Sequence, residues 1–249
     1  MMDGCPPAAA EASPPFPIPV RLPSAQFAAT LRAVIFDMDG LMLDTERWER
    51  AAWREVAAAH GHQLSDEFFA TLVGRRESDT AQRMQEHFGA RFPFEAARAQ
   101  ARALFDRWIG DCPPPLKPGL QSLLDTVQDL GLTLAVASST ARARAAQRLG
   151  ALAQRFRVSV FGDEVRHAKP HPEIYLRTLA QLGVAAAEAV ALEDSPPGFQ
   201  AARAAGLATL VVPDLLPAPE DAPYVCNSLK DVENWLRSAR ARTPGGKRL

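Results

Sequence analysis

The stretch "VIFDMDGLMLDTE", residues 34 to 46, decides the fold class of this 249-residue chain. It opens with an apolar run that is typical of a strand buried on both faces, and the carboxylates Asp37 and Asp39 follow that run directly. An acid after a strand is most often a turn former or a helix cap. The residues that follow the other strands must therefore show whether Asp37, Asp39 and the later Asp44 take part in a reaction.

Further apolar runs of the same kind follow, and helical patterns lie between most of them. One pattern, residues 119 to 131, places its leucines and a valine on one stripe and ends at Gly131, a residue suited to a helix C-terminus. The alternation predicts an α/β fold with a Rossmann-like, doubly wound parallel sheet. We expect its strands at residues 33–36, 132–137, 158–161, 189–192 and 208–212.

About seventy residues after the first strand have helical patterns only. They predict an all-helical cap domain, residues 46–117, inserted into an α/β core made of residues 30–45 and 118–240. Ser65 and Ser78 are expected as N-caps, and Gly74 and Gly89 as helix ends. The expected cap helices cover residues 46–60, 65–74, 78–89 and 94–109.

The composition excludes several classes of protein. The chain has 29 acidic and 28 basic residues, so no net field favours nucleic acid or an anionic membrane. We find no signal peptide and no run of about 18 apolar residues that would span a membrane. The scattered cysteines suit a reduced, cytoplasmic protein, which we expect as a monomer or homodimer. Residues 1–29, rich in Pro and Ala, and residues 241–249 are expected to be disordered.

Polar residues follow four of the expected strands, at the edge of a parallel sheet where ligands bind. Carboxylates and substrate phosphate suit Mg²⁺, whereas hydroxyls and a lysine suit phosphate oxygens. An Asp carboxylate is also a nucleophile toward phosphorus. The residues at these ends are Asp37, Asp39, Ser138, Ser139, Thr140, Lys169, Glu193, Asp194 and Ser195.

Lys169 is one of only four lysines among 28 basic residues and is followed by Pro170 and Pro172, which stiffen the loop. A lysine kept in this setting indicates that a compact ammonium is needed there. Thr140 is expected to cap a helix that starts near Ala141, with Ser138 facing the ligand. Trp48 and Trp53 are expected in the core of the cap. The five histidines show no ligand spacing along the chain, and we assign them no catalytic role.

Four motifs together carry a family resemblance: "DMDG", "ASS", "KPHPEIY" and "LEDSPPGFQAARAAG". In order, spacing and strand context they resemble the haloacid dehalogenase superfamily of phosphohydrolases, over residues 32 to 213 or so. The helical insert resembles the cap of the subgroup that includes β-phosphoglucomutase, phosphoglycolate phosphatase and pseudouridine-5'-phosphatase.

The resemblance implies a role for each matched residue. Asp37 would be the nucleophile that becomes an aspartyl phosphate, and Asp39 would protonate the leaving alcohol and then deprotonate water. Mg²⁺ would be bound by Asp37, the Asp39 backbone carbonyl and Asp194, with support from Glu193. Phosphate would be bound by Ser138, Ser139 and Lys169.

Where the sequence departs from the patterns of particular superfamily members, it argues against the reactions of those members. Asp39 argues against carbon–halogen cleavage, because the dehalogenases lack this second acid. A Schiff base to a cap lysine is excluded, because residues 46 to 116 contain no lysine. Glu49, four residues after Thr45, stands where β-phosphoglucomutase has a histidine. Thr45, Glu49, Arg75 and Arg76 are the candidate substrate contacts of the cap.

The sequence therefore predicts a Mg²⁺-dependent phosphatase that acts on a small phosphorylated metabolite of the sugar phosphate, phosphoglycolate or nucleotide type. One alternative is a sugar-phosphate mutase of the β-phosphoglucomutase type. Another is a protein that binds a phosphorylated metabolite without catalysis.

Overall fold

The structure is a computed structural model, and it describes residues 19–72 and 77–241. The chain divides into two compact units. Among the described residues, a helical unit runs from residue 44 to 115, and an α/β unit comprises residues 19–43 and 116–241. The sequence predicts unit boundaries after residues 45 and 117, whereas the structure places them after residues 43 and 115.

The α/β unit contains one sheet in the order β3-β2-β1-β4-β5-β6, and every neighbouring pair is parallel. The predicted α/β class with a doubly wound parallel sheet is therefore confirmed. β1 lies inside the sheet, between β2 and β4. The strands are β1 (Ala33–Phe36), β2 (Thr133–Ser138), β3 (Val158–Phe161), β4 (Ala189–Glu193), β5 (Ala208–Val211) and β6 (Tyr224–Val225).

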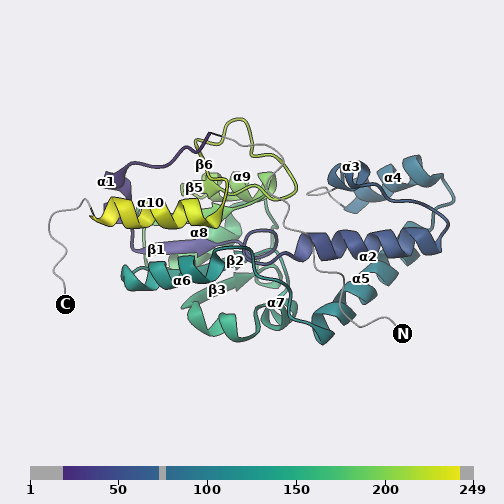
Figure 1. The fold of residues 1–249 in the computed structure, drawn as a ribbon, viewed down its shortest axis with the longest axis horizontal. Helices are drawn as coiled ribbons and strands as arrows, with labels where there is room; N and C mark the ends of the chain where they lie inside the picture. Colours follow the sequence, from purple (N-terminus) through teal and green to yellow (C-terminus); the bar gives the residue numbers. More distant parts are fainter. Residues whose placement is uncertain (1–18, 73–76, 242–249) are drawn as a thin grey trace. The chain divides into compact units, whose positions relative to one another are not determined.

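Both faces of the sheet are buried, because successive side chains along a strand point to opposite sides. In β1, Val34 and Phe36 belong to one apolar cluster, whereas Ala33 and Ile35 belong to another. The first cluster includes side chains from α1, α6, α7 and α10, and the second includes side chains from α8 and α9. Figure 1 shows these helices packed around the strands. These helices are α1 (Ala25–Thr30), α6 (Leu120–Asp129), α7 (Arg142–Leu149), α8 (Glu173–Leu182), α9 (Pro196–Ala204) and α10 (Leu229–Ala241). Short 3₁₀ helices η1 (Gly150–Arg155), η2 (Gly162–Glu164) and η3 (Ala186–Glu188) lie between them.

The helical unit is built from α2 (Thr45–Ala59), α3 (Asp66–Ala70), α4 (Glu77–Phe88) and α5 (Phe94–Asp111). Trp48 and Trp53 are buried as expected, and the Trp53 ring stacks on Phe94 with centroids 5.9 Å apart. Ser65 caps α3, where its Oγ accepts the Phe68 N–H at 3.1 Å. Ser78 is not an N-cap, because α4 already begins at Glu77. Gly74 lies outside the described residues.

The prediction of a disordered leader, residues 1–29, is wrong for residues 19–29, which the structure describes. Ser24 Oγ accepts the Phe27 N–H at 3.2 Å and starts α1, whose Ala28 is fully buried against the core. The indole of Trp235 on α10 also donates to the Pro23 carbonyl at 3.0 Å. Local capping and packing on α10 thus order a segment whose Pro-rich composition suggested a floppy chain.

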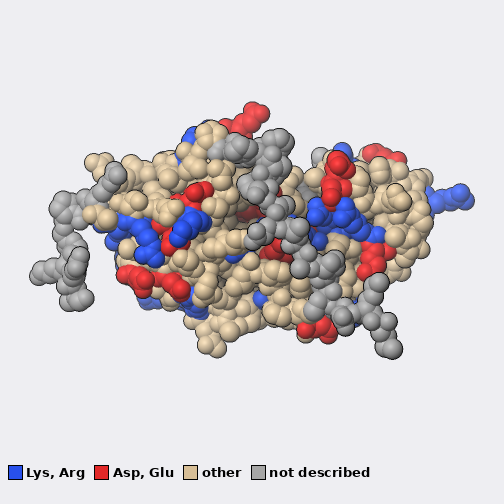
Figure 2. Space-filling view, in the orientation of Figure 1, with Lys and Arg blue, Asp and Glu red and all other residues tan. Residues whose placement is uncertain are grey.

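No helix in the described part of the chain is long and apolar enough to cross a membrane. Figure 2 shows Lys and Arg side chains lying beside Asp and Glu side chains, in line with the near-zero net charge. Cys226 is a buried free thiol.

Candidate active site

The carboxyl ends of three adjacent strands bring the candidate residues together. Phe36, the last residue of β1, is level with Val136 of β2 and Leu192 of β4. The Asp37 N–H continues this register by donating to the Leu192 carbonyl at 3.0 Å. Residues that directly follow these three positions therefore face one another across the edge of the sheet.

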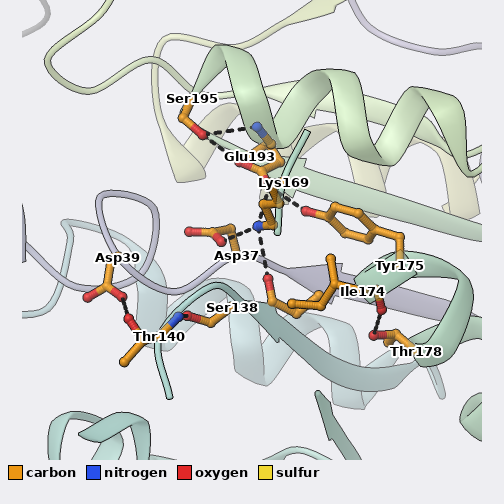
Figure 3. Close-up of polar contacts among 12 residues, drawn as sticks. Asp37, Asp39, Ser138, Thr140, Lys169, Ile174, Tyr175, Thr178, Glu193 and Ser195 are labelled. Atoms are coloured by element: carbon orange, nitrogen blue, oxygen red, sulfur yellow. Dashed lines mark hydrogen bonds and ion pairs between the residues drawn. The ribbon is translucent and has the colours of Figure 1, made fainter. Parts of the chain in front are cut away.

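Lys169 lies at the centre of this edge, in the loop between η2 and α8 (Figure 3). Its ammonium donates to Asp37 Oδ1 at 2.5 Å, to Glu193 Oε1 at 2.7 Å and to the Ala137 carbonyl at 3.0 Å. These three bonds match the three donors of an ammonium, and the side chain is only 6% exposed. The structure thus joins residues that are far apart in sequence into one buried ion-pair group.

Burial and charge act in opposite directions at this group. Burial raises the pKa of Asp37 to about 7, with help from the negative charges of Glu193 and Asp39 and against the effect of Lys169. Burial alone would lower the pKa of Lys169, but Asp37 and Glu193 outweigh it and hold that pKa well above its usual value. Lys169 is therefore a fixed positive charge beside Asp37.

Glu193 is fully buried and is held by protein partners. The Tyr175 hydroxyl donates to the same Oε1 that Lys169 contacts, and Ser195 Oγ donates to Oε2 at 3.3 Å. A Cβ on Gly198 would lie 2.0 Å from Oε2, so the carboxylate needs a glycine there. These contacts make Glu193 a support for Lys169.

Tyr175 is a site residue that sequence reasoning missed. It is fully buried, and Lys169 Nζ lies 5.1 Å from the centre of its ring. Burial and the charge of Glu193 raise the pKa of the Tyr175 hydroxyl well above its usual value, so it remains a donor. The residue lies in the quoted motif "KPHPEIY", six positions after the lysine, which was the available signal.

Asp39 makes separate contacts. Its Oδ2 accepts the Thr140 hydroxyl at 2.7 Å, and its Oδ1 is 2.6 Å from Arg148 Nη1. Figure 3 shows Asp39 beside Thr140, apart from the group around Lys169. The expectation that Thr140 caps α7 is wrong, because α7 begins at Arg142 and its N-cap, Ala141, makes no side-chain cap bond. Nothing in the sequence identified Arg148, because its contact depends on how α7 packs.

The two predicted serines differ in position. Ser138 is buried at the end of β2, and its Oγ accepts the Thr140 N–H at 3.1 Å. Ser139 is exposed, and its backbone carbonyl approaches Gly162 so closely that a Cβ there would lie 2.0 Å from the oxygen. The structure thus places Ser138 with Asp37 at the sheet edge, whereas the Ser139 side chain faces outward.

Asp37, Glu193 and Asp194 each offer a carboxylate oxygen within 4.8 Å of the others, and all three residues are buried. Gly40, with φ +82°, turns the chain so tightly against Asp194 that a Cβ would lie 2.2 Å from Asp194 Oδ2. Clustered carboxylate oxygens are a donor set that fits Mg²⁺. The Asp39 side chain, which is bound to Thr140 and Arg148, is not part of this group.

The candidate cap residues lie in the helical unit. Thr45 is the buried first residue of α2, and Glu49 is exposed on the same helix. Arg75 and Arg76 lie outside the described residues. Asp44 occupies the N-cap position of α2 but makes no side-chain cap bond, because its carboxylate is paired with Arg47. The Asp44 carboxylate is thus an ion-pair partner at the start of α2 and not a cap.

Comparison with known proteins gives consistent matches. The family model of haloacid dehalogenase-like hydrolases matches residues 34–212. A phosphorylated carbohydrates phosphatase of Thermotoga maritima is 34% identical over 71% of this chain and 82% of its own length.

Two solved structures show the same fold. A structure titled a putative β-phosphoglucomutase from Thermotoga maritima has a TM-score of 0.70 at 30% identity, covering 84% of this chain and 99% of that one. A mutant CbbY from Rhodobacter sphaeroides, in complex with xylulose 1,5-bisphosphate, has a TM-score of 0.65 at 29% identity, covering 80% and 95%.

Proposed function

Because this chain belongs to the haloacid dehalogenase-like hydrolase family, we propose that it is a phosphatase of small phosphorylated sugars that works through an aspartyl phosphate on Asp37. The observation that carries the proposal is the contact of 2.5 Å between Asp37 Oδ1 and Lys169 Nζ, beside the carboxylates of β4. The relatives described as a carbohydrate phosphatase and as a complex with a sugar bisphosphate support the class of substrate.

In the first step, an oxygen of Asp37 attacks phosphorus and the bond from phosphorus to the sugar oxygen breaks. Asp39 gives its proton to the departing sugar oxygen. In the second step, Asp39 takes a proton from water, the water oxygen attacks the aspartyl phosphate, and Asp37 is regenerated as phosphate leaves. Ser138 and Lys169 bind the phosphoryl oxygens, and Lys169 offsets the repulsion between Asp37 and the phosphate. We assign the outward-facing Ser139 side chain no role in this step.

Asp37 and Asp194 are the residues that would bind Mg²⁺ directly, with the Asp39 backbone carbonyl, because Glu193 is already bound to Lys169 and Tyr175. When bound, Mg²⁺ would offset negative charge on the phosphoryl group and favour ionised Asp37. Thr45, Glu49, Arg75 and Arg76 remain our candidates for contacts to the sugar. We expect the enzyme in the cytoplasm, as a monomer or homodimer, without nucleic acid or membrane partners.

The direct test is phosphate release from a panel of pentose and hexose phosphates with Mg²⁺ present. Wild-type protein should turn over at least one of them, and Asp37→Asn and Asp39→Asn should each lose turnover while keeping the wild-type circular dichroism spectrum. Asp125→Asn, at a surface ion pair of α6, is the matched control and should keep activity. Near-normal turnover by Asp37→Asn would refute the nucleophile, and no release from any substrate would favour a binding protein.

Removal of the metal gives an independent test. A chelator should abolish phosphate release, and Mg²⁺ added in excess should restore it, because phosphorylation of Asp37 needs the charge of a dication. Activity that survives extensive chelation would contradict the metal assignment without affecting the nucleophile.

The mutase alternative rests on the likeness to the putative β-phosphoglucomutase. Incubation with a hexose 1-phosphate separates the two reactions, because a phosphatase yields free phosphate and a mutase yields the isomeric hexose phosphate. Glu49 in place of a histidine, and a helical unit without lysine, lead us to expect free phosphate.

A further inference from the structure

The loop that carries Lys169 also holds side chains that the proposed reaction does not use. His167 and His171 lie two residues before and after the lysine, and Glu173 begins α8. One ligand atom of each of the three lies within 4.8 Å of those of the other two. We propose that His167 and His171 bind a divalent transition-metal ion such as Ni²⁺, Zn²⁺ or Cu²⁺, and that Glu173 orients His167 for it.

Glu173 fixes the state of the first imidazole. His167 Nδ1 lies 2.9 Å from Glu173 Oε2, and an ionised carboxylate can only accept a hydrogen bond. The Nδ1 atom therefore carries the proton, and the lone pair of the neutral ring is on Nε2. A histidine whose other nitrogen donates to a carboxylate is the usual arrangement of a metal ligand.

Glu173 is itself firmly placed. Its Oε1 accepts the Arg166 N–H at 2.9 Å, and its Oε2 accepts the His167 N–H at 3.1 Å. These two backbone donors hold the carboxylate in one orientation at the start of α8. The orienting group thus exists before any metal binds.

His171 supplies the second nitrogen. Its Nδ1 accepts the Glu173 N–H over a long 3.3 Å, so its lone pair is only weakly engaged. The rings of His167 and His171 lie 4.4 Å apart between centroids and are inclined by 37°. Their side chains are 62% and 49% exposed, so an ion can reach them and the rings can rotate to bonds of about 2.1 Å.

The chemistry of this site differs from that of the carboxylates around Asp37. Imidazole nitrogens favour Zn²⁺, Ni²⁺ and Cu²⁺, whereas Mg²⁺ favours oxygen ligands and water. The two sites should therefore accept different ions from the same solution. The two histidines are four residues apart in the sequence, and the path of the loop brings their rings together.

The test is calorimetric titration of NiCl₂ into protein without a polyhistidine tag. Excess Mg²⁺ is present throughout, so that the carboxylates around Asp37 are occupied and do not contribute. We expect wild-type protein to bind one equivalent of Ni²⁺ and the double variant His167→Gln/His171→Gln to lose that binding. Glu173→Gln should weaken the affinity about 10-fold to 100-fold, the usual effect of removing the partner of a ligating histidine.

The matched control is His62→Gln/His87→Gln, which removes the same number of histidines from the helical unit, where both rings contact Phe88. It should bind Ni²⁺ as the wild type does, and circular dichroism should show every variant folded. The proposal is overturned if wild-type protein binds no Ni²⁺, or if the double variant at 167 and 171 binds it as tightly as the wild type. Neither result depends on the phosphatase assignment.

Discussion

At the scale of single residues, the site depends on how buried charges are satisfied. Lys169 contacts two carboxylates, and Glu193 in turn accepts from Tyr175 and Ser195. A buried charge without a partner costs several kcal/mol, so each of these contacts stabilises the next. Removal of one member should therefore affect the others as well as the reaction.

Arg148 is the residue whose role can be tested most directly. It contacts Asp39 Oδ1 at 2.6 Å, while Thr140 contacts the other oxygen, so the two fix the orientation of the carboxylate. We expect Arg148→Gln to lower kcat roughly tenfold with little change in KM, because proton transfer depends on orientation. Steady-state kinetics on the best sugar phosphate measures this.

Arg155→Gln is the control for Arg148, because Arg155 pairs with Asp125 and Gln128 on α6. Its kcat should match the wild type. If Arg148→Gln also turned over normally, Arg148 would have no positioning role.

Gly40 tests the approach of the turn to Asp194. It has φ +82°, and the Cβ of Gly40→Ala would lie 2.2 Å from Asp194 Oδ2. Gly183→Ala is the control, because Gly183 has φ +66° but no atom lies within 4 Å of the added Cβ. This variant therefore has the backbone strain, about 1 kcal/mol, without a clash. Both should lower the melting temperature, but only Gly40→Ala should also lose Mg²⁺-dependent activity. Equal activities would show that the clash leaves Asp194 in place.

At the scale of secondary-structure elements, α6 and α10 are joined by a buried carboxylate. Glu233 on α10 accepts from Ser122 Oγ at 2.9 Å and Thr126 Oγ1 at 3.2 Å on α6, and also from Lys230 and Arg237 on its own helix. The bond from Lys230 is the largest of the effects that lower the pKa of Glu233 to about 2. Glu233→Gln should destabilise the protein by about 2 kcal/mol, the scale for hydrogen bonds to a charged group.

The same contact predicts a pH dependence. The pKa of Glu233 is lower in the folded protein than its ordinary value of 4.5, so the contribution to stability is complete above about pH 4.5 and is lost as the pH falls toward 2. Denaturant unfolding from pH 2 to 7 should show this slope in the wild type and a smaller slope in Glu233→Gln. Glu188→Gln, at the exposed ion pair with Arg32, is the control and should keep most of the wild-type dependence of stability on pH. Equal slopes for wild type and Glu233→Gln would refute the prediction.

At the scale of the whole molecule, we expect the α/β unit to fold by itself. The apolar clusters on the two faces of β1 consist of residues of this unit. Its chain ends at the insertion are adjacent, since Leu43 and Leu116 form an antiparallel bridge and Lys117 N–H donates to the Met42 carbonyl at 2.9 Å. A short Gly-Ser linker in place of residues 44–115 therefore needs to span only the short distance between residues 43 and 116.

We expect that variant to unfold cooperatively in urea and to keep the circular dichroism of a mixed α/β protein. Its turnover of sugar phosphates should fall, because the candidate contacts to the sugar leave with the helical unit. A variant that showed no cooperative transition would mean that the helical unit is needed for the core to fold.

The sequence alone predicted the parallel sheet, the inserted helical unit and the grouping of Asp37, Ser138, Lys169, Glu193 and Asp194 at one edge of the sheet. Strand ends carry this information locally, because buried runs and the polar residues after them are adjacent in the chain. The contacts of Tyr175 with Glu193, and of Arg148 and Thr140 with Asp39, became visible in the folded structure. These contacts depend on how α7, α8 and the lysine loop pack against the sheet, and side chains brought together by packing leave no spacing in the sequence to detect.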